Sequence, residues 1–368
     1  MLLSTTTIPF SEMSIDDKFS RIFLYVTISL VAIIAIIGFF TKKYRKENMP
    51  SFSKYAIGIL VGYSITVICS MFFFKIDAMV TEGYLYPLIF YPILVTAIVG
   101  ILLAVIGIAI NLIKPEIMKK YSFIGLGIIT LPVIASIVCI SIYYVQNIKD
   151  SEYYENVSNI GLIISAIALI VIIVALALIF GKKRKTTTKS IVYASVSIAL
   201  AFALSYIRMF KLPQGGSVTL ACLLPIIFYS YMFGIRKGVL IGSIFGILQA
   251  IQDPWIIHPA QFFLDYIIAF GAIGLAGIFK EIGIFKNNVV LSIFFGGLFA
   301  GILRYFCHVT SGIFAFSCYA EAGYGAIAWG FLYNLFVFVD LAICLGAGVI
   351  MCSSKSFAKM LIVEDNVN

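Results

Sequence analysis

The sequence predicts an all-α membrane protein with about eleven transmembrane helices. Of its 368 residues, 62% are hydrophobic and 12% are charged, and this composition excludes a soluble monomer. The apolar residues form runs of about 20, the length that a helix needs to cross the hydrocarbon layer. Because lipid offers no partners to backbone polar groups, these runs are expected to be helical. Short basic clusters separate them.

The expected spans follow one another with short loops. They cover residues 20–40, 53–74, 87–113, 121–145, 159–181, 190–210, 217–234, 237–252, 260–279, 288–312 and 327–351. The eighth span is the weakest, because it is short and contains Gly242 and Gly246. Another division of residues 190–252 would change the count by one.

Lys and Arg accumulate in alternate loops, as they do on the cytoplasmic side of membrane proteins. Residues 182–189 hold the strongest basic cluster, and further clusters follow at 236–237, at 280–286 and in the C-terminal tail. This pattern favours a multi-pass plasma-membrane protein with its N-terminus outside and its C-terminus inside. Arg208 and Lys211 fall at an external end and are the exception. We therefore interpret the net charge of +9 as a sign of topology, not of nucleic-acid binding.

The polar segment 182–189 divides the chain as a basic cytoplasmic linker. Residues 1–181 form five spans of Ile, Val, Leu and Ala, and nothing in them assigns a role. Residues 190–352 carry Pro, Gly, Trp, His, Asp and Asn at membrane depth, and residues 353–368 form a cytoplasmic tail. The halves show no internal repeat, so an inverted-repeat transporter is not supported. We predict that the chemistry of the protein lies in the second half.

The sequence contains no motif that indicates catalysis or metal binding. The seven cysteines lie mostly in apolar runs without CxxC spacing, which favours neither disulfides nor a zinc site. Zincin, nucleophile-elbow and phosphate-loop patterns are absent. We predict no catalytic residue, no metal and no cofactor. If ATP powers the protein, another subunit must hydrolyse it.

Four external ends of the C-terminal spans bring polar side chains to one level of the membrane. These are Asp265 and Tyr266 in the ninth span, His308 in the tenth, Asn334 in the eleventh, and residues 214–217 before the seventh. Polar groups inside spans are costly and mark functional sites by default. A desolvated carboxylate attracts a cation, aromatic rings stack on flat ligands, and Asn and His pair with ring nitrogens. The set predicts a site for a small, flat, cationic ligand from outside.

The acidic residues of this region have alternative roles. Asp265 and Asp340 are a weak candidate for an intramembrane aspartyl pair, because neither has Gly-rich flanks. Asp265 could instead form an ion pair with Arg304. For Asp340, which lies deeper, a structural bond to Arg304 or to the backbone is preferred.

Simpler roles also remain open for the aromatic residues and the histidine. Trp255 and Trp329 would each suit an aromatic belt at the membrane interface. His308 would equally suit a buried, neutral histidine with one partner.

Small residues recur every four positions on the sixth span. Ser195, Ala199 and Ala203 form one row, and Ser197, Ala201 and Ser205 form an adjoining row. Small side chains allow the close approach of another helix. The spacing fits a partner-docking surface and packing within the chain equally well.

Several motifs in the second half occur together and in order. They are Leu212-Pro213-Gln214-Gly215-Gly216-Ser217-Val218-Thr219-Leu220, Arg236-Lys237-Gly238, residues 252–261 (QDPWIIHPAQ), Leu264-Asp265-Tyr266, residues 304–308 (RYFCH) with Gly312, and Trp329 with Tyr333-Asn334. With these motifs, residues 188–352 closely resemble the thiamine-specific substrate-binding (S) component of energy-coupling factor (ECF) transporters, the ThiT or YuaJ family.

The resemblance implies a six-helix S-component fold that holds thiamine near the outer membrane face. A separate module of a transmembrane coupling protein and two ATPases would then drive its release inward. By resemblance, the ligand-binding residues are Trp255, Asp265, Tyr266, His308, Gly312, Phe316, Trp329 and Asn334. Asp265 would contact the thiazolium ring, and Phe316 stands where the family has a stacking Trp. The row Ser195, Ala199 and Ala203 resembles the family's docking motif for the coupling protein.

The first five spans are outside this resemblance. A second hypothesis therefore stands beside thiamine uptake. In it, the chain is a membrane enzyme or assembly factor whose second half only recognises a ligand for the first.

Overall fold

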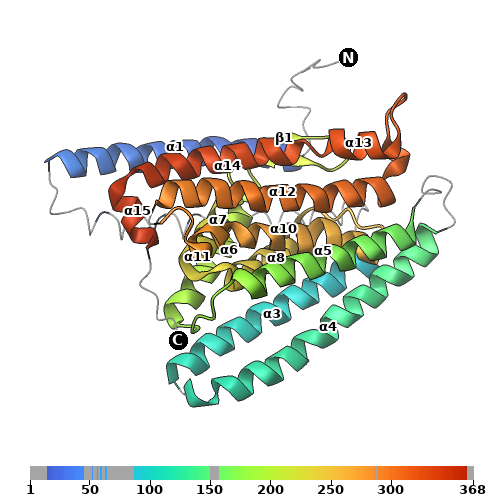
Figure 1. Ribbon diagram of the computed structural model, residues 1–368, viewed down its shortest axis with the longest axis horizontal. Coiled ribbons are helices and arrows are strands. Elements are labelled where there is room, and N and C mark those ends of the chain that lie inside the picture. The colour runs from blue at the N-terminus through green and yellow to red at the C-terminus, as the bar shows by residue number, and fades with distance from the viewer. Residues whose placement is uncertain are drawn as a thin grey trace.

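The computed structural model describes residues 15–44, 52, 56, 59, 63, 87–113, 115–149, 157–286 and 288–362. These residues are mostly helical, which confirms the predicted class apart from one two-stranded hairpin. Six of the described helical segments are long and apolar enough to cross a membrane: Gly127–Asn147, Asn159–Phe180, Thr188–Ser205, Pro259–Ile282, Val289–Ala315 and Ala326–Ser353. In Figure 1 the long helices run along the longest axis of the molecule. The count of eleven spans and the orientation of the termini stay predictions.

Four of the five predicted N-terminal spans are described. They form α1 (Ile15–Tyr44), α3 (Pro87–Ile113), α4 (Met118–Asn147) and α5 (Asn159–Phe180), and the short η3 (Pro115–Ile117) joins α3 to α4. The remaining span, 53–74, lies outside the described residues apart from single positions. Helices α3 and α4 pack against each other, and the buried hydroxyls of Thr96 and Ser136 hydrogen-bond between them at 3.0 Å.

A stripe of buried apolar residues joins α5 to the C-terminal half. Its members are Leu162, Ala166, Leu169, Ile173 and Ala177, which recur every three or four positions and so share one helix face. This face lies in one apolar cluster with Leu264, Ile268 and Cys307. Arg236 donates hydrogen bonds to the carbonyls of Ala177 (3.2 Å) and Leu178 (2.7 Å), which satisfies the last turn of α5.

The predicted linker 182–189 also contacts the C-terminal half. The side chain of Arg184 is only 8% exposed and pairs with Glu281 at 3.2 Å between Nη2 and Oε1. It also donates to the carbonyl of Met232. The division of the chain at this segment stays a prediction, but the segment is packed against its neighbours.

The predicted sixth and seventh spans have the wrong bounds. Helix α6 (Thr188–Ser205) ends before residue 210, and strands β1 (Arg208–Lys211) and β2 (Ser217–Thr219) then form an antiparallel hairpin. Gly215 has a φ of +84°, which glycine adopts without strain and which the tight turn requires. Helix α7 (Leu224–Phe233) has only 10 residues and, at about 15 Å, covers half of a hydrocarbon layer.

Helix α8 (Ile235–Gln252) is continuous, and its glycines are packing positions. A Cβ atom at Gly242 would lie 2.3 Å from the carbonyl oxygen of Phe270, and one at Gly246 would lie 2.2 Å from that of Tyr266. The absence of side chains therefore lets α8 approach the backbone of the next helical segment. The same glycines made this span look weak in the sequence.

The ninth and eleventh predicted spans are helical but irregular, whereas the tenth is one continuous helix. The ninth consists of α9 (Pro259–Phe262), the π-helix η5 (Phe263–Ile268), α10 (Ala269–Ile273), η6 (Gly274–Gly277) and α11 (Ile278–Ile282). Next come α12 (Val289–Ala315), η7 (Ser317–Tyr319), α13 (Ala326–Tyr333), α14 (Phe336–Ser353) and α15 (Lys355–Leu361). The eleventh span is thus interrupted at residues 334–335. The predicted tail begins with α15, whose Leu361 is buried.

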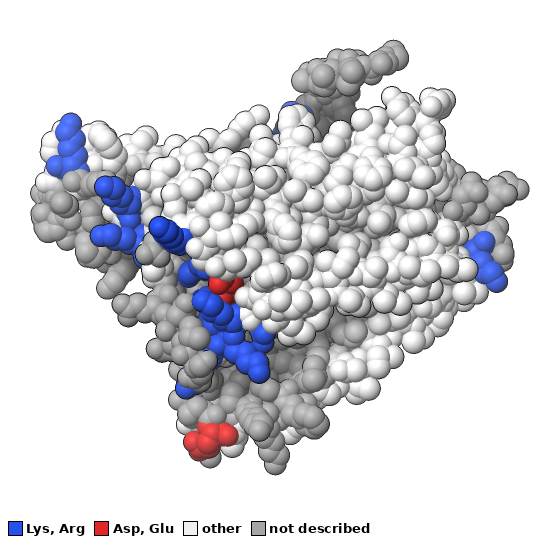
Figure 2. All heavy atoms as spheres, viewed as in Figure 1, with Lys and Arg blue, Asp and Glu red and all other residues white. Residues whose placement is uncertain are grey.

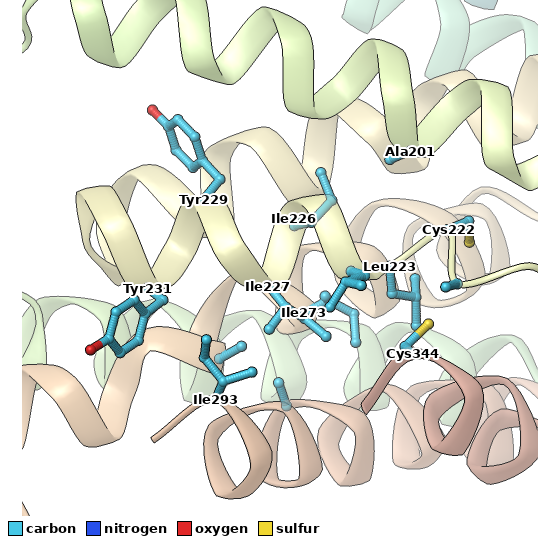
Figure 3. Packing of buried hydrophobic residues seen from close by; sticks show 14 of the residues in the cluster. Ala201, Cys222, Leu223, Ile226, Ile227, Tyr229, Tyr231, Ile273, Ile293 and Cys344 are labelled. Carbon is cyan, nitrogen blue, oxygen red and sulfur yellow. The ribbon is translucent and has the colours of Figure 1, made fainter. Parts of the chain in front are cut away.

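The core of the C-terminal half is built around α7. Figure 3 shows Ile227 on the side of α7 that faces Ile273 of α10 and Ile293 of α12, and Ile226 on the opposite side, towards the helix that carries Ala201. Outside the core, Lys and Arg gather mainly at one end of the face seen in Figure 2, and most of the rest of that face carries no charge. An uncharged band of this kind suits contact with lipid chains.

Candidate ligand-binding site

One cavity contains all eight residues that the sequence singles out for ligand binding. The cavity has a volume of about 160 Å³. Its lining includes Trp255, Asp265, Tyr266, His308, Gly312, Phe316, Trp329 and Asn334. They come from the loop after α8, from η5, from the end of α12 with the next residue, Phe316, and from α13 with the next residue, Asn334. The structure therefore brings together residues that lie up to 79 positions apart, between Trp255 and Asn334.

Asp265 lies on the π-helix, a rare wide turn that often occurs at functional sites. Its Oδ2 atom accepts hydrogen bonds from Gln261 Nε2 at 2.7 Å and from Ser311 Oγ at 2.5 Å. Its Oδ1 atom lies 3.0 Å from His308 Nδ1. An ionised carboxylate only accepts hydrogen bonds, so three groups that can donate surround the acid.

One ring nitrogen of His308 forms a hydrogen bond within the protein, and the other has no such partner among the described residues. Nδ1 bonds to Asp265, and Nε2 is buried with no hydrogen-bond partner in the part of the chain that the structure describes. A neutral ring whose Nδ1 donates to the carboxylate offers a lone pair at Nε2. A buried polar atom without a partner is costly, which suits a ligand contact at Nε2.

Arg304 pairs with Asp340 and not with Asp265. The Arg304 Nη1 to Asp340 Oδ2 distance is 2.9 Å, and both side chains are buried. Asp340 Oδ1 also accepts hydrogen bonds from the backbone nitrogen (3.0 Å) and hydroxyl (2.8 Å) of Thr219 in β2. The preferred structural role of Asp340 is confirmed, and the alternative pair of Asp265 with Arg304 is wrong. This network joins α12, α14 and the hairpin.

The turn of the hairpin lies across one side of the cavity. Gln214 donates to the carbonyl of Tyr319 at 3.1 Å and accepts from Trp329 Nε1 at 3.3 Å. The hydroxyl of Tyr333 accepts from the backbone nitrogen of Gly216 at 2.9 Å. The turn is therefore fixed to α13 and to the segment before it.

The loop that carries Trp255 is held by side chains of the next helical segment. The hydroxyl of Tyr266 accepts from the Trp255 nitrogen at 2.8 Å and donates to the Asp253 carbonyl at 3.0 Å. Gln261 donates to the Trp255 carbonyl at 3.0 Å and accepts from the Ile257 nitrogen at 3.2 Å. Tyr266, predicted as a ligand contact, lines the cavity while its hydroxyl supports the loop.

The two basic residues that contradict the charge pattern are paired. Arg208 lies 3.0 Å and Lys211 lies 3.7 Å from Asp253 Oδ2. A carboxylate from the neighbouring loop thus pairs with both cations and offsets one of their two charges. The orientation of the chain stays a prediction.

The sequence interpretation missed several polar residues of the cavity. Ser311 follows His308 by three positions and Gln261 precedes Asp265 by four, so helical spacing was a usable signal. A second group joins α6 to α8, where Ser205 Oγ donates to Gln252 Oε1 at 2.6 Å and accepts from Gln249 Nε2 at 2.8 Å. Their polar character within apolar helices was visible in the sequence.

The predicted docking row on α6 is only partly open. Ser195 is exposed, Ala199 is half-buried, and Ala203 is 4% exposed within the core. The adjoining row points further inward, because Ala201 and Ser205 are buried. A partner could reach the first half of the row, and the second half packs within the chain. Partner docking itself stays a prediction.

The fold and the cavity together define a multi-pass membrane protein with a cavity lined by polar and aromatic side chains. Residues 191–360 match the family model of the thiamine transporter proteins (Thia_YuaJ). Thiamine transporter ThiT of Bacillus subtilis (strain 168) is 31% identical over an alignment of 163 residues, and the match covers 42% of this chain and 83% of the relative. The chain belongs to this family. The predicted family membership is thereby confirmed.

A solved structure of ThiT from Listeria monocytogenes is also similar. It shares 20% sequence identity and covers 46% of this chain and 97% of its own, with a TM-score of 0.41. Family membership identifies a transport protein of the plasma membrane. Residues 1–190 lie outside the family match.

Proposed function

We propose that this chain captures thiamine from outside the cell in the cavity around Asp265. The Asp265 carboxylate carries the proposal, because hydrogen-bond donors stabilise it and no Lys or Arg among the described residues pairs with it. The membership of the chain in the thiamine transporter family supports this choice of ligand.

The charges around the cavity favour a cation. Among the charged residues that line the cavity, Arg304 pairs with Asp340, and Arg208 pairs with Asp253. Asp265 has neither Lys nor Arg as a partner among the described residues, so its negative charge is available to a cation. At the low dielectric of a largely buried site, a thiazolium ring would gain strongly from this charge.

Aromatic and polar groups suit the rest of the ligand. Trp255 and Phe316 meet edge to face with ring centroids 6.4 Å apart, and both line the cavity. Rings of this kind bind flat heterocycles by stacking and cation–π attraction. His308 Nε2 would accept a hydrogen bond from the amino group of the pyrimidine ring.

Transport inward would require an energising module. We propose that a transmembrane coupling protein docks at the open half of the row, at Ser195 and Ala199, and that two ATPases complete the assembly. The absence of a phosphate-loop motif from the sequence supports an external source of ATP hydrolysis.

Titration of the purified full-length chain with thiamine tests the proposal. Intrinsic fluorescence reports binding, because Trp255 and Trp329 both line the cavity. We expect a saturable change with thiamine and none with riboflavin or biotin. A folded chain that gives no saturable change with thiamine would contradict the proposed ligand.

A further inference from the structure

The start of α5 is joined to the end of α12, which carries part of the cavity. The backbone nitrogen of Ser158 donates to the carbonyl of Phe314 at 2.8 Å. Carbonyls in the last turn of a helix lack partners within that helix, so Ser158 supplies one from another part of the chain. The Ser158 hydroxyl also accepts from the Gly161 nitrogen at 3.3 Å and caps α5.

Side-chain packing at this junction is close. A Cβ atom at Gly161 would lie 2.5 Å from Cδ1 of Phe314, and 2.8 Å from its Cγ. The contact reaches the base of the ring, so rotation of the ring tip cannot relieve it. Phe316 of the cavity follows only two residues later. The position of α5 and the position of this cavity wall are thus mechanically linked.

A second contact reaches the loop that carries Trp255. The rings of Tyr144 in α4 and His258 meet edge to face, with centroids 4.8 Å apart and an angle of 87°. The Tyr144 hydroxyl donates to Asn159 Oδ1 at 2.8 Å, which ties the same residue to α5. His258 is buried and accepts from the Ala260 nitrogen through Nδ1 at 3.1 Å.

Helix α3 also packs against the loop that carries Trp255. Ile256 of the loop is 4% exposed and lies in an apolar cluster with Ile89, Phe90 and Ile93. Loop residues 253–258 therefore have the cavity on one side and the N-terminal helices on the other. Loops are usually mobile, so this backing would fix Trp255 in place.

We propose that helices α3, α4 and α5 position the cavity wall, so that their placement and the occupancy of the cavity are energetically coupled. Tyr144 and Gly161 are the positioning residues. The N-terminal region then regulates ligand retention, a role that the family match to residues 191–360 does not supply. The inference takes its ligand from the proposed function and otherwise rests on these contacts. Coupling of this type is reciprocal for binding free energies.

The test uses the full-length chain and two pairs of variants. Gly161→Ala forces α5 away from Phe314, whereas Gly127→Ala in α4 meets nothing within 4 Å and is the matched control. Tyr144→Ala removes the contact with His258, whereas Tyr144→Phe retains the ring. Two readouts are needed: hydrogen exchange of residues 255–258 without ligand, and the dissociation rate of thiamine.

We expect faster exchange and at least about five-fold faster thiamine release in Gly161→Ala and Tyr144→Ala. Gly127→Ala should match the wild type in both rates, and Tyr144→Phe should keep its exchange and thiamine-release rates close to those of the wild type. Unchanged exchange in both disruptive variants would overturn the inference. If the wild type binds no thiamine, the proposed function fails, and hydrogen exchange still decides the inference.

Discussion

Asp340 and Asp265, which both line the cavity, are satisfied in different ways. Asp340, 1% exposed, has a cation in Arg304 and two donors from Thr219. Asp265 has only groups without a fixed charge as partners, namely Gln261, Ser311 and His308. A Lys or Arg in place of one of these partners would neutralise the Asp265 carboxylate from within the protein. The contrast supports a structural role for Asp340 and the proposed ligand contact of Asp265.

His258 makes the stability of the protein depend on pH. Burial lowers its pKa from 6.5 to about 4. Above pH 6.5 the His258 side chain is neutral in both the folded and the unfolded chain. Below pH 6.5 it is protonated in the unfolded chain but stays neutral in the folded chain until the pH approaches 4. We therefore expect the free energy of unfolding to fall as the pH drops from 6.5 towards 4.

The variant His258→Asn isolates this effect. Asparagine is a good N-cap residue and can accept from the Ala260 nitrogen, but it does not titrate. Thermal unfolding in detergent at about pH 7.5 and about pH 5 should show a smaller loss in the variant than in the wild type. Equal losses in the two proteins would exclude His258 as the cause.

At the scale of elements, apolar length predicted most helices but not their irregularities. The spans at 87–113 and 159–181 correspond closely to α3 and α5. Hydropathy carries no signal for the π-helix that holds Asp265 or for the hairpin at residues 208–219. The turn residues Pro213, Gly215 and Gly216 do indicate a tight turn, but the apolar residues on either side of them favoured helical spans.

Cavity residues were predictable for a different reason. Asp265, His308 and Asn334 are polar residues in apolar surroundings, so their cost in lipid marks them individually. Ser311 is small and common in membrane helices, and its role depends on a neighbour 46 positions away, Asp265. Pairings of this kind require the fold.

Close packing of α8 leads to a prediction for Gly246. In Gly246→Ala the new Cβ would collide with the backbone of Tyr266, so α8 must move away from the π-helix. We expect a loss of about 1–3 kcal/mol in stability and weaker thiamine binding. Gly346→Ala in α14 meets nothing within 4 Å and controls for the helix propensity of alanine. A thermal midpoint equal to that of the control would contradict close packing at Gly246.

At the scale of the whole molecule, the described N-terminal helices and the family-matched half share apolar clusters. The sequence did not predict this, because the spans before residue 181 are uniformly apolar and show no distinct contact face. In α5 only the structure distinguishes the buried stripe from the exposed face. The described N-terminal helices therefore pack against the half of the chain that forms the cavity.

The charge pattern predicts the orientation of the molecule in the membrane. A protease added to intact cells should remove a tag placed at the N-terminus and should leave a C-terminal tag intact until the cells are permeabilised. The opposite pattern of protection would contradict the orientation, and with it the opening of the cavity to the outside.

The central claim is that the charge of Asp265 selects a cationic ligand. The most direct test compares thiamine affinity in the full-length wild type, in Asp265→Asn and in Glu321→Gln, which changes an exposed acid outside the cavity. We predict that Asp265→Asn raises Kd at least about ten-fold while the chain remains folded, and that Glu321→Gln leaves it unchanged. An Asp265→Asn protein that binds thiamine as tightly as the wild type would contradict the claim.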